Sequence, residues 1–333
     1  MIHQQNRHLV DSIMVPHRAV SVALKRINQC LDAADGLMEP ICIPLIGESG
    51  TGKTRILESI SANYQSVRQE SGLYVPLIRI TAPSLPTIKG LYETLLLALG
   101  DPIPWKGTIS NMDKRLLLLM KTIGTKVVML DEFHHFENKK ENTVLNTLKN
   151  ILNNSGVILI VSGLPVCMAV LSKSKEMQRR SESPIVMPKF DWQLEDDREE
   201  FFAILQSFHQ RLSAYYELPE LHSDEMAFRF YCATGGLIGY LTKILRKATW
   251  DAIDENRSVI TLDDLDQSYR NVVIAQNYFN GKSPFKHGFT TQATNDTLMS
   301  AKEIGVPEIE QSTWTRQTYM KPSSSSAASV LRT

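Results

Sequence analysis

This chain of 333 residues is poor in the features that mark specialised classes of protein. It has only four cysteines, scattered without a Cys-x-x-Cys pair, so neither a disulfide scaffold nor a zinc knuckle is expected, and a reducing cytoplasm fits. The chain also has no excess of positive or negative charge, because its 36 Lys and Arg residues balance its 36 Asp and Glu residues. That balance excludes a histone-like polycation but allows a local basic stripe. No run approaches 18 apolar residues and no signal-peptide pattern is present, so we expect neither secretion nor a membrane span.

The length is about twice that of a typical single domain, so the sequence predicts two compact units. Hydrophobic residues make up 43% and charged residues 22%, the balance of an ordinary globular protein. The patterns along the chain divide it into four expected segments. These are an N-terminal helical segment (1–35), an α/β core (36–190), a smaller all-helical domain (191–278) and a flexible C-terminal tail (279–333).

Apolar runs alternate with helical patterns between residues 40 and 190, which is typical of a parallel sheet covered on both faces. The expected strands are Ile41–Ile46, Tyr74–Ile80, Lys126–Leu130, Val157–Val161 and Pro184–Met187. The expected helices are Arg55–Tyr64, Thr87–Leu99, Asp113–Ile123 and Thr143–Leu152. Pro44 and Pro76 fall inside two of these strands and argue against central ladder positions there, because proline cannot donate a backbone hydrogen bond.

The pattern becomes helical after about residue 190. The expected helices are Asp196–Tyr216, Ser223–Thr234, Ile238–Ile253 and Leu262–Ala275. Beyond Asn280 the chain is polar and aperiodic, which predicts a flexible tail. Its isolated aromatics, Trp314 and Tyr319, allow two interpretations. The segment is either a short docking peptide for a partner protein or an unstructured end without a function.

The strongest pattern is G-x-x-x-x-G-K-[ST], which directly follows one strand run and directly precedes a helix. Its residues are Gly47, Glu48, Ser49, Gly50, Thr51, Gly52, Lys53 and Thr54. Such a loop turns backbone N–H groups towards the phosphates of a nucleotide, while its lysine neutralises phosphate oxygens and its final hydroxyl ligates Mg²⁺. The pattern therefore predicts ATP and Mg²⁺ as ligands.

An acidic pair, Asp131 and Glu132, follows the apolar run Lys126–Leu130. We expect the strand to deliver Asp131 beside the phosphate loop, where it can support Mg²⁺, and to place Glu132 where it can polarise an attacking water. Hydrolysis is therefore predicted, rather than transfer to a bound acceptor. Ser162 ends the next strand run, where it either contacts the γ-phosphate or merely caps the strand.

Two further pairs of residues are candidates. Arg179 and Arg180 lie in a basic segment before the last strand and could act on a neighbouring subunit's nucleotide as an arginine finger. The competing interpretation is a solvated helix end. His134 and His135 suggest a metal site, but adjacent residues on one turn rarely both chelate, so we favour relay of the γ-phosphate state or packing for them.

With these motifs the chain resembles the AAA+ ATPases and, more narrowly, the TniB/TnsC family of transposition regulators, including those of CRISPR-associated elements. The similarity covers roughly residues 10–275. The segments that carry it are Gly47–Thr54, Asp131–His135, Ser162–Pro165, Gln178–Arg180 and Thr234–Gly239.

The resemblance implies a P-loop AAA+ core of α/β class followed by a helical lid, and an ATP-bound oligomer, ring or filament, on duplex DNA. The oligomer would link a target-selection protein to the transposase, and hydrolysis would drive its disassembly. By position, the resemblance assigns phosphate and Mg²⁺ binding to Lys53 and Thr54, metal support to Asp131, the base to Glu132 and the sensor-1 role to Ser162.

Arg179 or Arg180 matches the arginine-finger region of the family. The lid departs from the AAA+ pattern, because Tyr240 stands directly after Gly239 where a sensor-2 arginine is expected nearby. The nearest cations are Lys243 and Arg246.

Contact with duplex DNA is expected through the backbone, since no base-reading motif is present. The candidates are Thr87, Lys89, Lys106, Lys114, Arg115 and Lys121, and for each of them an ordinary solvated helix face is the competing interpretation. Two other functions share the same motifs: a replication-initiator or helicase-loader ATPase, and an interaction platform whose ATP site is structural.

Overall fold

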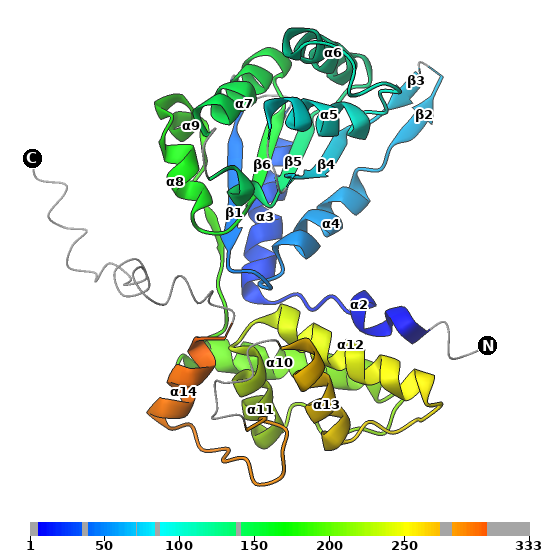
Figure 1. Cartoon of the computed structure of the whole chain (residues 1–333), viewed down its shortest axis with the longest axis vertical. Helices are drawn as coiled ribbons and strands as arrows, with labels where there is room; N and C mark the ends of the chain where they lie inside the picture. Colours follow the sequence, from blue (N-terminus) through cyan, green and yellow to red (C-terminus); the bar gives the residue numbers. More distant parts are fainter. Residues whose placement is uncertain are drawn as a thin grey trace, which may run out of the picture.

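The computed structural model describes residues 6–34, 39–70, 72–83, 87–137, 141–273 and 282–304 (Figure 1). Two bodies follow one another along its long axis. One contains a parallel sheet with helices on both faces, and the other is built from helices alone. Within the described residues, no helix has the length and apolar character needed to cross a bilayer.

The sheet has the strand order β4-β5-β6-β1-β7, and every neighbouring pair runs parallel. Its strands are β1 (Cys42–Gly47), β4 (Leu77–Thr81), β5 (Val127–Asp131), β6 (Ile158–Gly163) and β7 (Ile185–Met187). All residues of β1, β5 and β6 are buried, as the continuous apolar runs in the sequence predict for central parallel strands. The predicted α/β class with a parallel sheet is confirmed.

The two prolines have different outcomes. Pro44 lies inside the central strand β1, but the regular ladder from β1 to β7 begins only at Leu45, so the proline lies where that ladder is interrupted. Pro76 precedes the edge strand β4, and its carbonyl accepts hydrogen bonds from the N–H groups of Lys126 and Val127. The predicted strand Tyr74–Ile80 is therefore divided. Its first residue belongs to a separate hairpin of β2 (Val67–Gln69) and β3 (Gly72–Tyr74).

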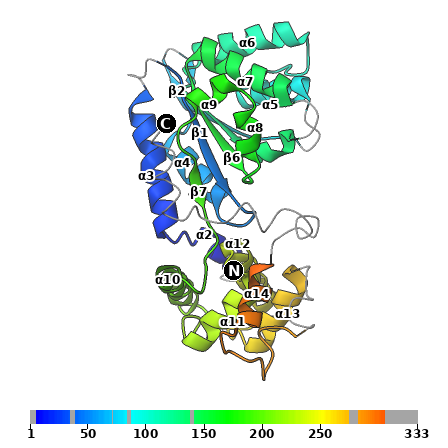
Figure 2. The ribbon, with the colours of Figure 1, turned by 90° about the vertical axis from the view of Figure 1, so that its left-hand side faces the viewer.

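Helices cover both faces of the sheet (Figure 2). On one face lie α3 (Arg18–Asp32) and α4 (Lys53–Asn63), whose apolar side chains pack on those of β1, β5 and β6. The other face carries α5 (Ile88–Ala98), α6 (Ile109–Thr122), α7 (Glu141–Ser155), α8 (Cys167–Ser172) and α9 (Lys175–Arg180). A parallel sheet needs this double cover because both of its faces are apolar.

The helical body, called the lid below, has its own hydrophobic core. Its helices are α10 (Glu195–Leu212), α11 (Asp224–Thr234), α12 (Ile238–Asp254), α13 (Leu262–Val272) and α14 (Asn295–Lys302). Ser223 and Thr261 cap two of these helices through their hydroxyls, as the sequence suggests. The N-terminal segment contributes to both bodies, because α3 packs on the sheet while η1 (Asn6–His8) and α2 (Leu9–Ser12) contact α12 (Figure 1).

The end of the described chain differs from the predicted flexible tail. Residues 282–304 fold back onto the lid, where Phe285 is fully buried and stacks edge-on against Phe230 at 5.0 Å. Helix α14 packs on α11, and a Cβ added to Gly235 would lie only 2.5 Å from the carbonyl oxygen of Ala301. Trp314 and Tyr319 lie outside the described residues.

A lysine in the connection between the two bodies ties α14 to the phosphate loop. The Nζ of Lys189 donates to the carbonyl oxygen of Lys302 at 2.7 Å and lies 3.5 Å from the carboxylate of Glu48. The side chain of Lys302 in turn pairs with Asp191 at 2.9 Å. The last residue of α14, which lies within the predicted tail, is therefore close in space to a motif about 250 positions earlier in the chain.

Candidate nucleotide site

The phosphate loop connects β1 to α4 and takes the shape that the glycine pattern predicts. Gly50 and Gly52 have φ of +84° and +94°, a region that is costly for residues with a side chain. Lys53 is only 6% exposed, and its Nζ donates to the carbonyl oxygens of Gly47 and Glu48, both at 2.8 Å. Burial lowers the pKa of Lys53, while Glu132 and Asp131 oppose that shift. The ammonium group of Lys53 is thus held by carbonyl oxygens of its own loop, close to the carboxylates of Asp131 and Glu132.

Thr54 and Asp131 meet although 77 positions separate them. The Thr54 hydroxyl donates to the Asp131 carboxylate at 2.9 Å, and Asp131 is 4% exposed at the C-terminal end of β5. Ligands of open parallel sheets bind at this edge, beyond the carboxyl ends of the strands. A hydroxyl beside a carboxylate offers the oxygen ligands that Mg²⁺ prefers, so these residues fit the predicted metal.

Glu132 adopts an unusual backbone conformation for a residue with a side chain. Its φ is +55° and ψ +36°, and its N–H donates to the Asp131 carboxylate at 3.0 Å. This left-handed geometry costs of the order of 1–3 kcal/mol and is concentrated at functional sites. The Glu132 carboxylate lies 3.3 Å from Nε2 of His134, which belongs to the short helix η3 (Phe133–Phe136).

Ser162 lies near the end of β6, opposite Leu45 of β1. Val161 pairs with Leu130 of β5, so Ser162 is level with Asp131. The serine is fully buried, and its hydroxyl has no hydrogen-bond partner among the described residues. A buried hydroxyl left unpaired at the ligand-binding edge of a sheet fits contact with a polar ligand better than strand capping does.

The lid touches the phosphate loop directly. The N–H of Gly239 donates to the carbonyl oxygen of Gly50 at 2.8 Å, and a Cβ added to Gly239 would lie 2.7 Å from the Gly50 Cα. Glycine is therefore required on the lid side of this contact. The motif Thr234–Gly239, which the sequence relates to the family, thus places a backbone hydrogen bond between the two bodies.

A cleft of about 340 Å³ opens between the phosphate loop and the lid. One wall is formed by the phosphate loop, with Glu132 beside it. The rest of the lining is mainly apolar. Its apolar residues come from segments far apart in the sequence, namely Val10, Ile13, Met14, Val15, Val20, Ile204, Phe208 and Ile238. The sequence does not predict these walls, because the residues form no motif and meet only through packing of α2, α10 and α12.

Lys243 and Arg246, the two cations nearest Gly239, both line this cleft. Arg246 is engaged, since it pairs with Asp11 at 2.9 Å and its guanidinium lies 5.3 Å from the Trp250 ring centre. Lys243 lies 5.3 Å from the Tyr240 ring centre and forms no ion pair within the described part of the chain. Of the two, Lys243 is the cation available to a ligand in the cleft.

A protein-family model described as "Bacterial TniB protein" matches residues 6–192, more than half of the chain. The chain belongs to the TniB family. No curated protein matches it.

Similar solved structures include a Cdc6p, an Orc1 protein and a Walker-type ATPase. Cdc6p from Pyrobaculum aerophilum is 16% identical, with TM-score 0.60 over 82% of this chain and 72% of that one. Orc1 from Aeropyrum pernix, solved in complex with DNA, is 15% identical, with TM-score 0.57 over 80% and 69%. A Walker-type ATPase of Pyrococcus abyssi is 14% identical, with TM-score 0.53 over 82% and 77%. At such identities the likeness concerns the fold, which confirms the predicted AAA+ core with its helical C-terminal region.

The two candidate finger arginines of this TniB family member lie in different surroundings at the end of α9. The side chain of Arg179 is 62% exposed and pairs with the exposed Glu39 at 3.3 Å. The side chain of Arg180 is 10% exposed and turns to Glu176 at 3.4 Å. Neither lines the cleft, so only Arg179 has the exposure needed to reach another subunit.

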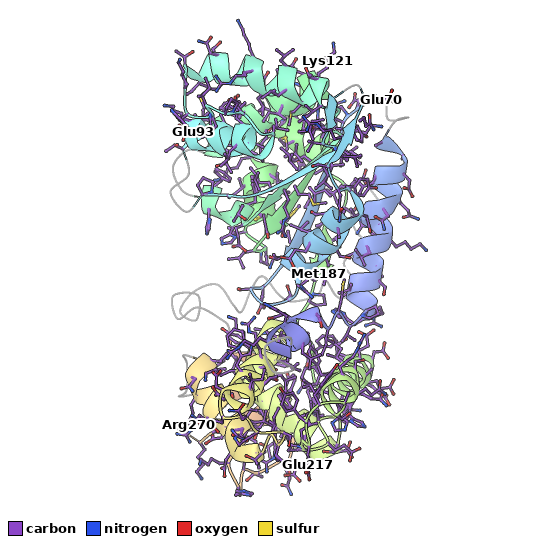
Figure 3. The ribbon with its side chains drawn as sticks, turned by 90° about the vertical axis from the view of Figure 1, so that its right-hand side faces the viewer. Glu70, Glu93, Lys121, Met187, Glu217 and Arg270 are labelled. Carbon is purple, nitrogen blue, oxygen red and sulfur yellow. The ribbon has the colours of Figure 1, made fainter. Side chains whose placement is uncertain are left out.

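The residues predicted to contact DNA also differ in exposure and in their contacts. Lys114 and Lys121 are exposed on α6, and Lys121 lies at the end of the molecule remote from the lid (Figure 3). Lys89 pairs with Glu93 at 3.6 Å, and the Thr87 hydroxyl caps α5 by accepting from the Gly90 N–H. Lys106 precedes α6 and is exposed.

Arg115, which is also predicted to contact DNA, makes several contacts within the protein. Its Nε lies 2.5 Å from the carboxylate of Asp101, which is 3% exposed. Its two terminal nitrogens donate to the carbonyl oxygens of Ile103, Pro104 and Lys106. The guanidinium therefore holds the α5–α6 connection together and has few donors left for a DNA phosphate, while its sequence neighbour Lys114 points to solvent.

Proposed function

We propose that this TniB family member hydrolyses ATP with Mg²⁺ and uses the nucleotide state to control its assembly on duplex DNA. The proposal rests on one observation, that three parts of the chain meet at one edge of the sheet. The phosphate loop, the acidic pair of β5 and the lid converge there, with Thr54 bonded to Asp131 and Gly239 bonded to Gly50. This arrangement supplies phosphate binding, metal ligation and a base within one cleft.

Each residue of the site has a task in this reaction. Backbone N–H groups of the loop and Lys53 hold the phosphate oxygens, and Lys53 exchanges its present carbonyl partners for them. Thr54 and Asp131 would hold Mg²⁺, which would neutralise negative charge on the phosphate oxygens. Glu132 orients the attacking water and accepts its proton. Ser162 satisfies its buried hydroxyl on the γ-phosphate.

The cleft also offers a route from the nucleotide to the lid. The apolar walls fit a purine base, and Lys243 can reach phosphate from α12 in place of a sensor-2 arginine. Because Gly239 is bonded to the phosphate loop, a nucleotide that reshapes the loop changes the position of the lid. Nucleotide binding and the position of the lid are then coupled, because both depend on the same contact between the lid and the phosphate loop.

Assembly follows from the exposed arginine of α9. Arg179 leaves Glu39 and completes the site of a neighbouring protomer, so ATP stabilises a ring or filament while hydrolysis releases it. Exposed lysines on α6 contact the DNA backbone without reading sequence. Membership of the TniB family supports a role in transposition, in which the assembly links a target-selection protein to the transposase.

Glu132→Gln tests the base, because it removes the carboxylate charge and preserves the shape. We expect the variant to bind ATP, to lose turnover by a factor of about 100 or more, and to form long-lived assemblies on duplex DNA. Glu137→Gln is the matched control, since it makes the same change at an exposed site five residues away. Lys53→Ala should abolish binding itself. Native turnover in Glu132→Gln would refute the assignment and favour an ATP site with a structural role.

Electron microscopy with a slowly hydrolysed ATP analogue tests the assembly. We expect rings or filaments with duplex DNA and analogue together, and their loss in Arg179→Ala but not in Lys175→Ala on the same helix. Equal assembly by both variants would refute the finger assignment.

A further inference from the structure

A cluster of three metal-binding side chains lies beside the phosphate site. Glu132, His134 and His135 each offer one ligand atom, and these atoms lie within 4.8 Å of one another. All three residues come from one turn at the end of β5. Sequence spacing alone speaks against two adjacent histidines chelating together, but the 3₁₀ turn brings their ring centres to 4.6 Å with the rings tilted by 60°.

The hydrogen bonds of His135 leave one nitrogen free for a metal. Its Nδ1 lies 3.2 Å from the carbonyl oxygen of Ala82, a group that can only accept. Nδ1 therefore carries the proton and donates, which leaves the lone pair on Nε2. Histidine ligands of metals are held in this way, with the second ring nitrogen donating to a carbonyl or carboxylate.

His134 also presents Nε2 to the cluster. That nitrogen lies 3.3 Å from the Glu132 carboxylate, while Nδ1 is buried and packs next to Gly163, where an added Cβ would come within 3.3 Å of it. The missing side chain at Gly163 makes room for the ring.

We propose that Glu132, His134 and His135 form a binding site for a transition-metal ion of the Zn²⁺ type. Two imidazoles and one carboxylate are a ligand set that Zn²⁺ accepts in proteins, with a further position left to water. Zinc bonds of about 2.0–2.2 Å place tetrahedral ligands roughly 3.3 Å apart. The Glu132 carboxylate and Nε2 of His134 already have this separation, and ligand atoms of the cluster that lie up to 4.8 Å apart need to approach by up to about 1.5 Å. Side-chain rotation supplies this movement, since Glu132 is 39% exposed.

The site differs in chemistry from that of Mg²⁺. Thr54 and Asp131 offer oxygen only, which suits Mg²⁺, whereas imidazole nitrogen favours Zn²⁺, Co²⁺ and Ni²⁺. Occupation of the cluster holds the Glu132 carboxylate on the metal and away from the attacking water. The ion therefore inhibits hydrolysis, a consequence that rests on the proposed role of Glu132, whereas the binding itself does not.

Cobalt is the probe for binding, because Co²⁺ in a site with nitrogen ligands absorbs visible light. The full chain is titrated with Co²⁺ in the absence of nucleotide and Mg²⁺. We expect one ion per chain, and affinity reduced about tenfold or more in His135→Gln. His287→Gln, at an exposed histidine outside the cluster, is the control and should bind like the native protein. Glu132→Gln should also lose the bands, and its ATP binding reports that it is folded.

Inhibition is measured separately with Zn²⁺ in excess Mg²⁺, each protein being compared with its own metal-free rate. We expect native turnover to fall and to recover with a zinc-selective chelator, and His135→Gln to resist inhibition. Absence of cobalt bands in the native protein, or equal bands in His135→Gln, overturns the site. Binding without inhibition overturns the regulatory consequence. A native protein that binds Co²⁺ but never hydrolyses ATP refutes the proposed function and leaves the metal site standing.

Discussion

Replacing Arg115 with alanine should destabilise the sheet-containing body more than it changes contact with DNA. The guanidinium forms an ion pair with the nearly buried Asp101 and donates hydrogen bonds to three carbonyl oxygens of the α5–α6 connection. Its removal leaves the Asp101 carboxylate buried without its cation and frees the connection that presents the exposed Trp105. The loss is therefore structural in origin.

The size of the effect follows from the burial of the two partners. Breaking a fully buried ion pair by removing one partner costs about 3–5 kcal/mol. Here Asp101 has only 3% of its side chain exposed, but Arg115 has 28%, so water replaces part of the interaction. We expect roughly 2–3 kcal/mol for Arg115→Ala, which lowers Tm by roughly 5–10 °C.

Thermal unfolding and the salt dependence of DNA binding, measured on the same samples, separate the two roles. Lys114→Ala is the matched control, because it removes an exposed cation from the adjacent position of the same helix. Its Tm should stay close to native, while the slope of log affinity against log salt should fall by about one if Lys114 contacts a phosphate. An Arg115→Ala protein with native Tm and a shallower salt slope would refute this reasoning.

Three further changes test other parts of the structure. Gly239→Ala forces the lid away from Gly50 and breaks one backbone hydrogen bond, so nucleotide affinity should fall by about tenfold in a calorimetric titration; unchanged affinity would contradict the lid contact. Phe285→Ala empties a fully buried position and should cost about 3–5 kcal/mol of unfolding free energy by denaturant titration, whereas a flexible tail would lose nothing. Burial lowers the pKa of His17, so the unfolded chain takes up a proton first as pH falls below about 6.5, and Tm should drop there more steeply than in His17→Gln. Equal acid sensitivity of the two proteins would assign the drop to other groups.

The phosphate site could be predicted from sequence because its chemistry is local. The Gly47–Thr54 loop needs only a strand before it and a helix after it. Asp131 reaches Thr54 because the carboxyl ends of parallel strands share one edge, a rule that holds whatever the residues between them contain. The α/β class and the helical region after residue 190 follow from hydrophobic periodicity in the same way.

Other features depend on packing that no local pattern records. Lys114 and Arg115 are neighbouring cations on one helix. Arg115 binds the buried Asp101 of the preceding connection, whereas Lys114 is exposed to solvent, and this difference arises only in the folded chain. The walls of the cleft come from α2, α10 and α12, which meet only in the folded chain. The sequence of α14 does contain a helical pattern, since Thr294 caps the helix and the buried residues Leu298, Ala301 and Ile304 recur at helical spacing. Eight residues are too few for this pattern to be distinguished from chance.

Lys189 links the C-terminal side of the described chain to the phosphate loop. It holds the last carbonyl of α14 with the same ammonium group that faces Glu48, and residues 10–15 line the cleft from the other end. Changes in α2 or α14 are therefore expected to alter nucleotide binding. By reciprocity, a docking partner that pulls on α14 would shift nucleotide affinity by the same free energy with which nucleotide shifts docking.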